Sequence, residues 1–397
     1  WYVSPAPDYA AANSAEPGYA AQIPVIYGGA AVPPGGQPDI LGPASANFDF
    51  TPYLATATDT APASGFQGDF SSLYVTAVAG QTGATARVQE GVDAVTPAGT
   101  VRVVAGSYAG DTLVAKALNL YGAKQGVAVG GRTFGGPAES TLSGMLTIQA
   151  AGVTVDGFSE TNVVPSGGVI GFLVKTAGTN AVIANNIFDT ISTPDVSATG
   201  IAQAIYLDNG PDGVQILNNA IRNVTSDRSA KGILIGDSAS SDPSQNVVIQ
   251  GNRISNIAST TRGGYGILVG NLAGAPNLQV VGNVIDSLSS ASGWVHAIGL
   301  ERNTPNVSVN HNVISNLSAP GPDKVAVWFE SNPSFATALV NRNSLAVGPA
   351  VAGILLHPAL VGGPVNGSCN WWGDPTGPSG AGAGIGSGLV RLFLEPG

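Results

Sequence analysis

The sequence predicts an all-β solenoid built from stacked coils. Three observations support this prediction: asparagines that recur at a regular spacing, a strand-like phrase that follows them, and a composition rich in turn-forming residues. Successive asparagines are 27 to 33 residues apart, and a period of about 20 to 50 residues is typical of solenoids. The recurring positions are Asn186, Asn219, Asn252, Asn283, Asn312 and Asn343, extended by Asn370.

The asparagines are expected to be structural. Asn219, Asn252, Asn283 and Asn312 each open the phrase Asn-x-Ile-x-[Asn/Ser]-[Val/Ile/Leu]. An asparagine at the same phase of every coil predicts an internal ladder of amides, each bonding to the coils above and below. Such a ladder satisfies polar groups whose burial would otherwise be costly.

The amino-acid composition limits the classes of molecule that the protein is expected to bind. Charged residues make up 10% of the 397 residues, with 55 Gly and 27 Pro, a net charge of −10 and a pI near 4.6. The negative charge argues against nucleic acid or an anionic membrane as a partner. No stretch approaches the roughly 20 apolar residues of a membrane helix, so membrane insertion is not expected. The single Cys369 rules out an internal disulfide, and we expect it to be buried in the last coil. The low charge and abundant small residues suit an extracellular bacterial surface protein.

Two regions are expected along the chain. Residues 1–74 are a Pro/Gly/Ala-rich, extended arm, and residues 75–397 form the solenoid. Within the solenoid, residues 84–95 predict a helix, because Val88, Val92 and Val95 fall on one helical face and Pro97 stops it. A helix before the first coil would cap the open apolar end. Residues 370–397 close the other end.

One strand per coil can be aligned in the second half of the chain. Its first and third positions are apolar and are expected to face inward, whereas the second and fourth face outward. Equivalent strands of stacked coils lie about 4.7–4.9 Å apart, so each outward position forms a column of near neighbours. The aligned strands are 205–208, 233–236, 267–270, 298–301, 327–330 and 354–357.

Three features together resemble the right-handed parallel β-helix, or pectin-lyase-like, superfamily. Residues 88–108 look like its opening helix and first coil, and the Asn-x-Ile coils match its body. The run Asn370-Trp-Trp-Gly-Asp-Pro-Thr-Gly-Pro378 is similar to a closing motif of bacterial surface β-helix proteins. The resemblance covers roughly residues 75–397. It implies a right-handed parallel β-helix but no particular activity, because this fold hosts lyases, hydrolases, epimerases and adhesins alike.

The two ends of the chain are similar to each other. In such surface proteins the closing motif is typically followed, after a Gly/Pro-rich stretch, by a phrase like Phe50-Thr-Pro-Tyr-Leu54. Residues 1–54 therefore resemble the tail of a preceding unit, offset by about 370 residues. This predicts a tandem array in which copies of the chain contact one another end to end, and the alternative is a private N-terminal arm. The tryptophans of the closing motif are also expected to plug the end of the solenoid. The contact residues would be Trp1, Tyr2, Trp371 and Trp372.

Outward carboxylates are the candidate catalytic residues. Glu301 and Glu330 end successive aligned strands, and a retaining glycosidase uses two carboxylates about 5–5.5 Å apart. Like charges this close also raise one pKa, which acid catalysis needs. With His357 one coil further, the trio could instead bind a divalent metal, and Asp208 lies three coils before Glu301. The alternative is a solvent-facing turn in which Arg302 neutralises a carboxylate.

Aromatic residues suggest a second kind of site. Tyr206, Trp328, Trp294 and His296 could form a groove that binds a sugar chain. However, leucines occupy the same outward column as Tyr206 and Trp328, and a mostly apolar outer column predicts cover by a loop or a partner instead. The carbohydrate groove and the covered column both stay open as alternatives.

Apart from a divalent metal at the Glu301 trio, the sequence suggests one cofactor, a Ca²⁺ ion, and otherwise no cofactor is expected. Asp237, Asp242 and Lys231 provide the acidic ligands and the base of a Ca²⁺-dependent lyase. The two aspartates lie in a Ser-rich turn, which Asx-type turn formation also explains.

Two functions follow from these observations. The first is a non-catalytic, structural or adhesive module of a repetitive surface or filament-forming protein, whose partners would be further copies of the chain and possible surface glycans. The second is a polysaccharide-active enzyme, a glycoside hydrolase or lyase, that uses carboxylates on stacked coils. Neither function involves nucleic acid.

Overall fold

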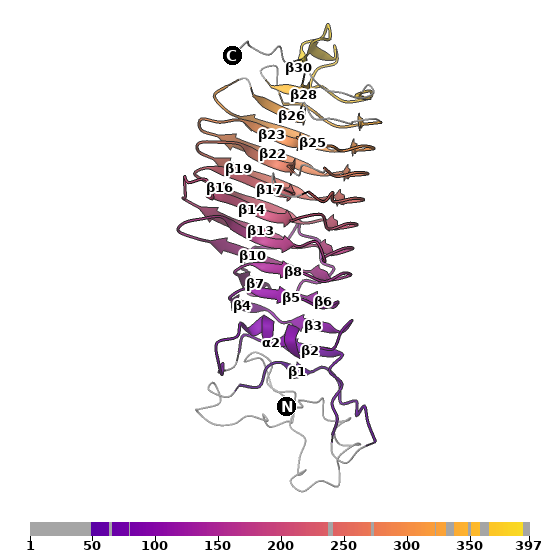
Figure 1. The fold of residues 1–397 in the computed structure, drawn as a ribbon. Coiled ribbons are helices and arrows are strands. Elements are labelled where there is room, and N and C mark those ends of the chain that lie inside the picture. Colours follow the sequence, from indigo (N-terminus) through magenta and orange to yellow (C-terminus); the bar gives the residue numbers. More distant parts are fainter. Residues whose placement is uncertain are drawn as a thin grey trace.

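The chain folds into a right-handed parallel β-helix, an elongated stack of coils with almost no helix (Figure 1). The computed structural model describes residues 49–62, 66–78, 80–236, 241–270, 274–321, 323–330, 337–347, 351–357 and 365–391. The predicted fold class is therefore confirmed. Trp1, Tyr2 and most of the predicted arm lie outside the described residues, so the predicted end-to-end contact stays a prediction.

Three sheets run along the stack. Sheet 1 contains β1 (Tyr53–Leu54), β2 (Ser72–Val75), β3 (Thr100–Val103), β6 (Asn119–Tyr121), β9 (Thr154–Asp156), β12 (Val182–Ala184), β15 (Gln215–Leu217), β18 (Val248–Gln250), β21 (Gln279–Val281), β24 (Ser308–Asn310) and β27 (Leu339–Asn341). Sheet 2 contains β4 (Gly106–Ala109), β7 (Ser140–Ser143), β10 (Phe158–Val163), β13 (Ile187–Thr193), β16 (Ala220–Ser226), β19 (Arg253–Ser259), β22 (Val284–Ser290) and β25 (Val313–Ser318). Sheet 3 contains β5 (Thr112–Val114), β8 (Leu146–Ile148), β11 (Val169–Val174), β14 (Ile201–Leu207), β17 (Ser229–Ile235), β20 (Gly264–Val269), β23 (Val295–Leu300), β26 (Lys324–Phe329), β28 (Ala352–Leu356), β30 (Gly386–Arg391) and β29 (Pro378–Gly380).

The core consists of aliphatic columns that run through the coils. A regular coil gives one strand to each sheet in turn, as β15, β16 and β17 do, and the next coil repeats the pattern in parallel register. Ile216 lies beside Ile249 in sheet 1, and Ile233 beside Ile267 in sheet 3, all fully buried. Because side chains alternate along a strand, every second one points inward. Similar residues therefore lie on top of one another in successive coils.

The asparagine side chains hydrogen-bond from coil to coil inside the solenoid. Asn252 Nδ2 donates to the Ile216 carbonyl at 2.8 Å and to Asn283 Oδ1 at 3.0 Å, while its Oδ1 accepts the Asn219 backbone N–H at 2.9 Å. These amides are buried, so every bond replaces one that water would otherwise supply.

A turn with positive φ precedes each ladder asparagine. Glycine and asparagine occupy most of that column, because positive φ is strained for most other side chains. Cys369 occupies it with φ of 60° and is exposed. The expectation of a buried Cys369 was therefore wrong: the turn points its side chain to solvent. The column consists of Gly157, Asn185, Asn218, Gly251, Gly282, His311, Arg342 and Cys369.

A helix covers the first coil, as predicted. Helix α2 (Arg87–Ala94) buries Val88 and Val92 against the core. Arg87 anchors it, since the guanidinium lies 2.6 Å from Asp49 Oδ1 and 3.1 Å from Glu90 Oε2. The apolar end of the stack is thereby closed by a helix face rather than exposed to water.

The two tryptophans of the closing motif differ in environment. Trp372 packs against the core and lies over Gly353, where a Cβ would come within 3.0 Å of its ring. Trp371 is 49% exposed and pairs through its backbone with Ser344 on the outside of sheet 2. The expectation that both plug the end is therefore wrong for Trp371, because successive residues of an extended segment point to opposite faces, while Trp372 packs on the last coil.

Among the described residues, no helix is both long and apolar enough to span a lipid bilayer.

Candidate functional site

The strands of sheet 3 bend at a column of small residues. In β14, Ala204 and Ile205 are consecutive and both fully buried, which interrupts the usual alternation. A Cβ at the equivalent Gly232 would lie 2.6 Å from the Gly266 carbonyl oxygen and 2.9 Å from Ile254 Cγ2, so only a very small residue fits. The same position holds glycine or alanine from β11 to β28, namely Gly171, Ala204, Gly232, Gly266, Ala297, Ala326 and Gly353.

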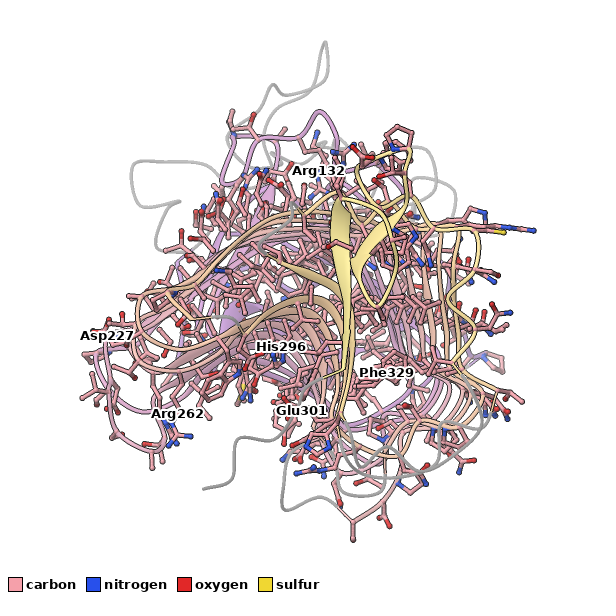
Figure 2. All side chains as sticks on the ribbon, turned by 90° about the horizontal axis from the view of Figure 1, so that it is seen from above. Arg132, Asp227, Arg262, His296, Glu301 and Phe329 are labelled. Carbon is pink, nitrogen blue, oxygen red and sulfur yellow. The ribbon has the colours of Figure 1, made fainter. Side chains whose placement is uncertain are left out.

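The bend brings two outward columns together. Tyr265 lies on one side of it and Leu234 and Leu268 on the other, and all three pack in one cluster outside the core. Figure 2, a view down the stack, shows His296 at the inner corner of this face, with Arg262 on one arm and Glu301 on the other. We call this surface the bent face. The convergence of the two columns buries the outward apolar side chains, for which the sequence predicted cover by a loop or a partner.

The predicted sugar-binding rings lie on the bent face but are largely inaccessible. Tyr206 and Trp328 are 8% exposed and His296 is 3% exposed. The three rings therefore pack beneath the surface of the bent face and do not present a flat, exposed ring to a sugar. Trp294, which precedes β23, is only partly buried and is the aromatic ring of this group that a ligand can reach.

Glu301 is the central carboxyl of the bent face. It follows β23, and its backbone N–H donates to the Val269 carbonyl of the preceding coil at 3.1 Å. Its Oε1 accepts the Tyr265 hydroxyl at 3.1 Å, and that hydroxyl in turn accepts the Trp294 indole N–H at 2.6 Å. Burial, followed by the charge of Glu330, raises the pKa of Glu301. The carboxyl is thus suited to hold a proton at a pH where ordinary glutamates have lost theirs.

Glu330 lies one coil further and has a different environment. Its backbone N–H donates to the Leu300 carbonyl at 3.1 Å, so it stacks directly on Glu301 in the same column. Arg302 Nη1 donates to Glu330 Oε2 at 3.0 Å and to the Glu301 carbonyl at 2.9 Å. The pairing of Arg302 with a carboxylate that the non-catalytic alternative predicted is therefore present, and it involves Glu330 alone. One carboxyl is shielded and the other is paired with a cation.

His296 forms a third element of the site. Its Nε2 lies 2.8 Å from Asp323 Oδ1, and its ring packs edge-on against Tyr265 at 5.5 Å and beside Trp328 at 5.4 Å. A carboxylate accepts hydrogen bonds only, so His296 donates to Asp323 through Nε2. His296 Nδ1 is buried without a hydrogen-bond partner among the described residues.

Buried polar atoms without a partner gather at this coil. Within the described part of the chain, His296 Nδ1, Arg302 Nε and Asn303 Oδ1 all lack one. Such atoms are rare in folded proteins, and they are often retained where a side chain takes part in catalysis or in ligand binding. Their concentration beside Glu301 is a second indication, independent of the carboxylates, that this part of the bent face is functional.

The remaining predicted site residues lie on the same column as the two glutamates. Asp208 lies three coils before Glu301. It forms an ion pair with Lys175 at 2.6 Å and accepts a hydrogen bond from the Tyr206 hydroxyl at 3.0 Å. His357 follows Glu330 by one coil, with its ring 6.3 Å from that of Trp328. The structure therefore brings Glu301 and Glu330 together and leaves Asp208 apart.

The metal alternatives find no support in the geometry. The described residues contain no group of three or more His, Cys, Asp or Glu side chains placed to hold a metal ion, and the divalent-metal alternative at Glu301, Glu330 and His357 stays untested. Of the suggested Ca²⁺ residues, Asp237 lies outside the described residues, and the Ca²⁺ site stays a prediction.

Sequence reasoning missed Tyr265, Asp323 and the bend itself. A usable signal for the bend was present, because a glycine or alanine stands directly before each leading aliphatic residue of the aligned strands. Tyr265 and Asp323 carry no such signal: their importance depends on contacts between coils, which the order of residues along one coil does not reveal.

Comparison with known proteins yields similar solved structures. No protein-family model matches the chain, and no curated protein matches it either. One similar solved structure is the catalytic unit of the thermostable GH87 alpha-1,3-glucanase from Streptomyces thermodiastaticus strain HF3-3, with a TM-score of 0.34, 12% identity, and coverage of 73% of this chain and 68% of that one. Another is the Dettilon tailspike protein, with a TM-score of 0.31, 10% identity, and coverage of 74% of this chain and 62% of the tailspike. At these values no residue role is transferred to this chain.

Proposed function

We propose that this protein is an extracellular β-helix that binds a glycan chain on the bent face and cleaves its glycosidic bonds with Glu301 and Glu330. One observation supports the proposal above all: two carboxyls on consecutive coils have opposite environments. Glu301 is shielded and accepts a tyrosine hydroxyl, whereas Glu330 is paired with Arg302. Titratable groups whose surroundings differ in this way are candidates for the acid and its partner in a hydrolase.

We propose a separate role for each group. Glu301 would donate its proton to the glycosidic oxygen as the bond between that oxygen and the anomeric carbon breaks. Glu330, as the anion, would either attack the anomeric carbon or take a proton from the water that attacks it. Trp294 offers a partly exposed ring on which a sugar can stack. The raised pKa of Glu301 predicts that activity persists to a higher pH than an ordinary glutamic acid would allow, and falls as this acid ionises.

Glutamine variants test the two roles. We expect Glu301→Gln and Glu330→Gln each to abolish the release of reducing ends from a panel of polysaccharides, while circular dichroism and thermal unfolding stay close to wild type. Asp286→Asn is the matched control, since Asp286 belongs to β22, in the same coil as Glu301 but on sheet 2. It should retain full cleavage. Undiminished cleavage in both glutamine variants, or no wild-type cleavage of any glycan in the panel, would refute the proposal.

A second candidate is a structural or adhesive module of a repetitive surface protein. The observation that favours it is the exposed Trp371, which shares its outward column on sheet 2 with the exposed Val313 two coils away. Large exposed apolar side chains near one end of a rod suit a contact with another chain. Electron micrographs of the isolated protein distinguish the two functions: end-to-end filaments support the module, and separate rods at high concentration contradict it.

A further inference from the structure

The position of Tyr265 depends on two glycines. A Cβ at Gly299 would lie 3.0 Å from Leu268 Cδ1 and 3.5 Å from Tyr265 Cδ1, so this glycine leaves room for the tyrosine ring to lie across the next coil. A Cβ at Gly263 would collide with both the Tyr265 ring and the Trp294 indole. The two absent side chains therefore create the space in which the two rings meet. A side chain at Gly263 would displace the tyrosine from Glu301, whereas a Cβ at Gly299 would press on Leu268 and only touch the tyrosine ring.

The hydrogen bonds between these groups have a defined direction. An indole N–H is only a donor, so Trp294 Nε1 donates to the Tyr265 oxygen at 2.6 Å. Burial, and then the charge of Glu301, raise the pKa of Tyr265 well above its usual range, so the hydroxyl keeps its proton. Its single proton is then donated to Glu301 Oε1, 3.1 Å away. Glu301 Oε1 is thus an acceptor in this arrangement.

We propose that Tyr265 and Trp294 are positioning residues for Glu301: they hold its carboxyl in one orientation and reserve Oε2 as the oxygen that carries and delivers the acid proton. This inference rests on the proposed function of the same carboxyl. A proton on Oε1 would compete with the tyrosine hydroxyl for the space between the two oxygens. The proton is therefore placed on Oε2, from which it moves to the glycosidic oxygen in the step described above.

Other charged groups also shift the pKa of Glu301, and their effects have to be separated from that of the Tyr265 hydroxyl. Glu330 raises the pKa of Glu301, and His296 and Lys231 lower it, as does the bond from Tyr265. Arg302 pairs with Glu330, and Asp323 faces His296 and acts on Tyr265. None of these groups changes when the Tyr265 hydroxyl alone is removed, so Tyr265→Phe isolates its contribution.

The test is a titration of Glu301 that does not depend on catalysis. Protein labelled with ¹³C at glutamate carboxyls is titrated by NMR, and the Glu301 signal is identified by its loss in Glu301→Gln. We expect Tyr265→Phe to raise the pKa of Glu301 further, because the bond that favours its anion is lost. Trp294→Phe, which keeps a ring but loses the indole N–H, should move the pKa in the same direction by less. Tyr206→Phe is the control, because that hydroxyl bonds to Asp208 instead, and it should leave the Glu301 titration unchanged.

The outcomes separate this inference from the proposed function. An unchanged Glu301 titration in Tyr265→Phe overturns the positioning role, whatever the enzyme does. If the titration moves and wild type cleaves glycans, the pH profile of cleavage should move by the same amount and in the same direction in Tyr265→Phe. A pH profile that stays in place while the titration moves would also overturn the role. If the titration moves but no glycan is cleaved, the hydrogen-bonded arrangement stands and the proposed hydrolase falls.

Discussion

Replacing Arg132 by methionine is expected to lower the free energy of unfolding by about 3–5 kcal/mol. Arg132 belongs to the loop between β6 and β7 and forms a two-pronged ion pair with Glu139, at 3.0 and 2.6 Å. Both side chains are 3% exposed. Removing one partner leaves the other charge buried without compensation, and that is the costly case for a buried ion pair.

Arg132 also connects this loop to later coils. Its Nη2 donates to the Phe158 carbonyl at 3.1 Å and its Nη1 to the Asn185 carbonyl, while Glu139 accepts the Ser159 hydroxyl at 3.1 Å. The variant therefore loses bonds to β10 and to the turn before β13 as well as the ion pair. Hydrogen exchange should accelerate first in the loop and in these two coils.

The matched control removes both charges. In Arg132→Met with Glu139→Leu no buried charge is left unpaired, and part of the lost stability should return, because apolar replacements of buried ion pairs are often neutral or favourable, whereas the bonds to Phe158, Asn185 and Ser159 stay lost. Urea unfolding followed by circular dichroism measures the midpoint and slope for wild type, both single variants and the double variant. Equal midpoints for Arg132→Met and wild type would show that the pair contributes nothing to stability.

The periodic part of the structure could be predicted from the sequence. The asparagine spacing and the alternation of the aligned strands both repeat from coil to coil, and each repeat adds independent support for the same phase. The capping helix was predictable for a local reason, because Val88 and Val92 lie on one helical face and Pro97 follows. In both cases the physical cause acts within one coil or one helix, so it leaves a pattern in consecutive residues.

The site was predictable only as far as it follows that pattern. Glu301 and Glu330 could be placed on one column, because each ends an aligned strand. The partner of Glu301 could not, since the Tyr265 hydroxyl reaches it from 36 residues earlier and across a bend that only the stacked coils produce. Likewise, the accessibility of Trp328 depends on how two outward columns converge, which alternation along one strand does not predict.

The early coils could be assigned to the solenoid, but the residues of their ladder and inward columns could not be predicted, because these coils leave the repeat. Phe158, not asparagine, occupies the ladder column at β10, where its N–H donates to Asn186 Oδ1 at 2.9 Å. Two residues later Glu160 stands in an inward column of otherwise aliphatic or aromatic residues, between Leu142 and Phe188. A carboxyl in this position contradicts the alternation rule, so sequence patterning assigns it to solvent.

Replacing Glu160 by leucine is expected to stabilise the protein at neutral pH. The side chain is fully buried in the core, and neither carboxyl oxygen has a hydrogen-bond partner among the described residues. Burial, and then the charge of Asp111, raise the pKa of Glu160 well above its usual range. The folded protein therefore keeps this acid protonated, whereas the unfolded chain releases the proton above a pH of about 4.5.

The sign of the pH dependence follows from that difference. Below the unfolded pKa both states hold the proton and Glu160 has no effect on the pH dependence. As the pH rises above it, the unfolded state is favoured by about 1.4 kcal/mol per pH unit until the folded carboxyl also ionises. Wild type should therefore lose stability relative to Glu160→Leu as the pH increases from 5 to 8, in addition to any constant cost of the unpaired carboxyl.

Glu160→Gln separates the two contributions. Glutamine has nearly the same size and is also polar, so it keeps the cost of burying a polar group without partners but cannot titrate. We expect its stability to follow the pH dependence of Glu160→Leu at a lower level, with wild type alone showing the additional slope. Urea midpoints at several pH values between 5 and 8 measure all three proteins. Parallel curves for wild type and both variants would show that Glu160 has the same pKa in the folded and unfolded chain, and hence that the core around Phe188 does not shield it.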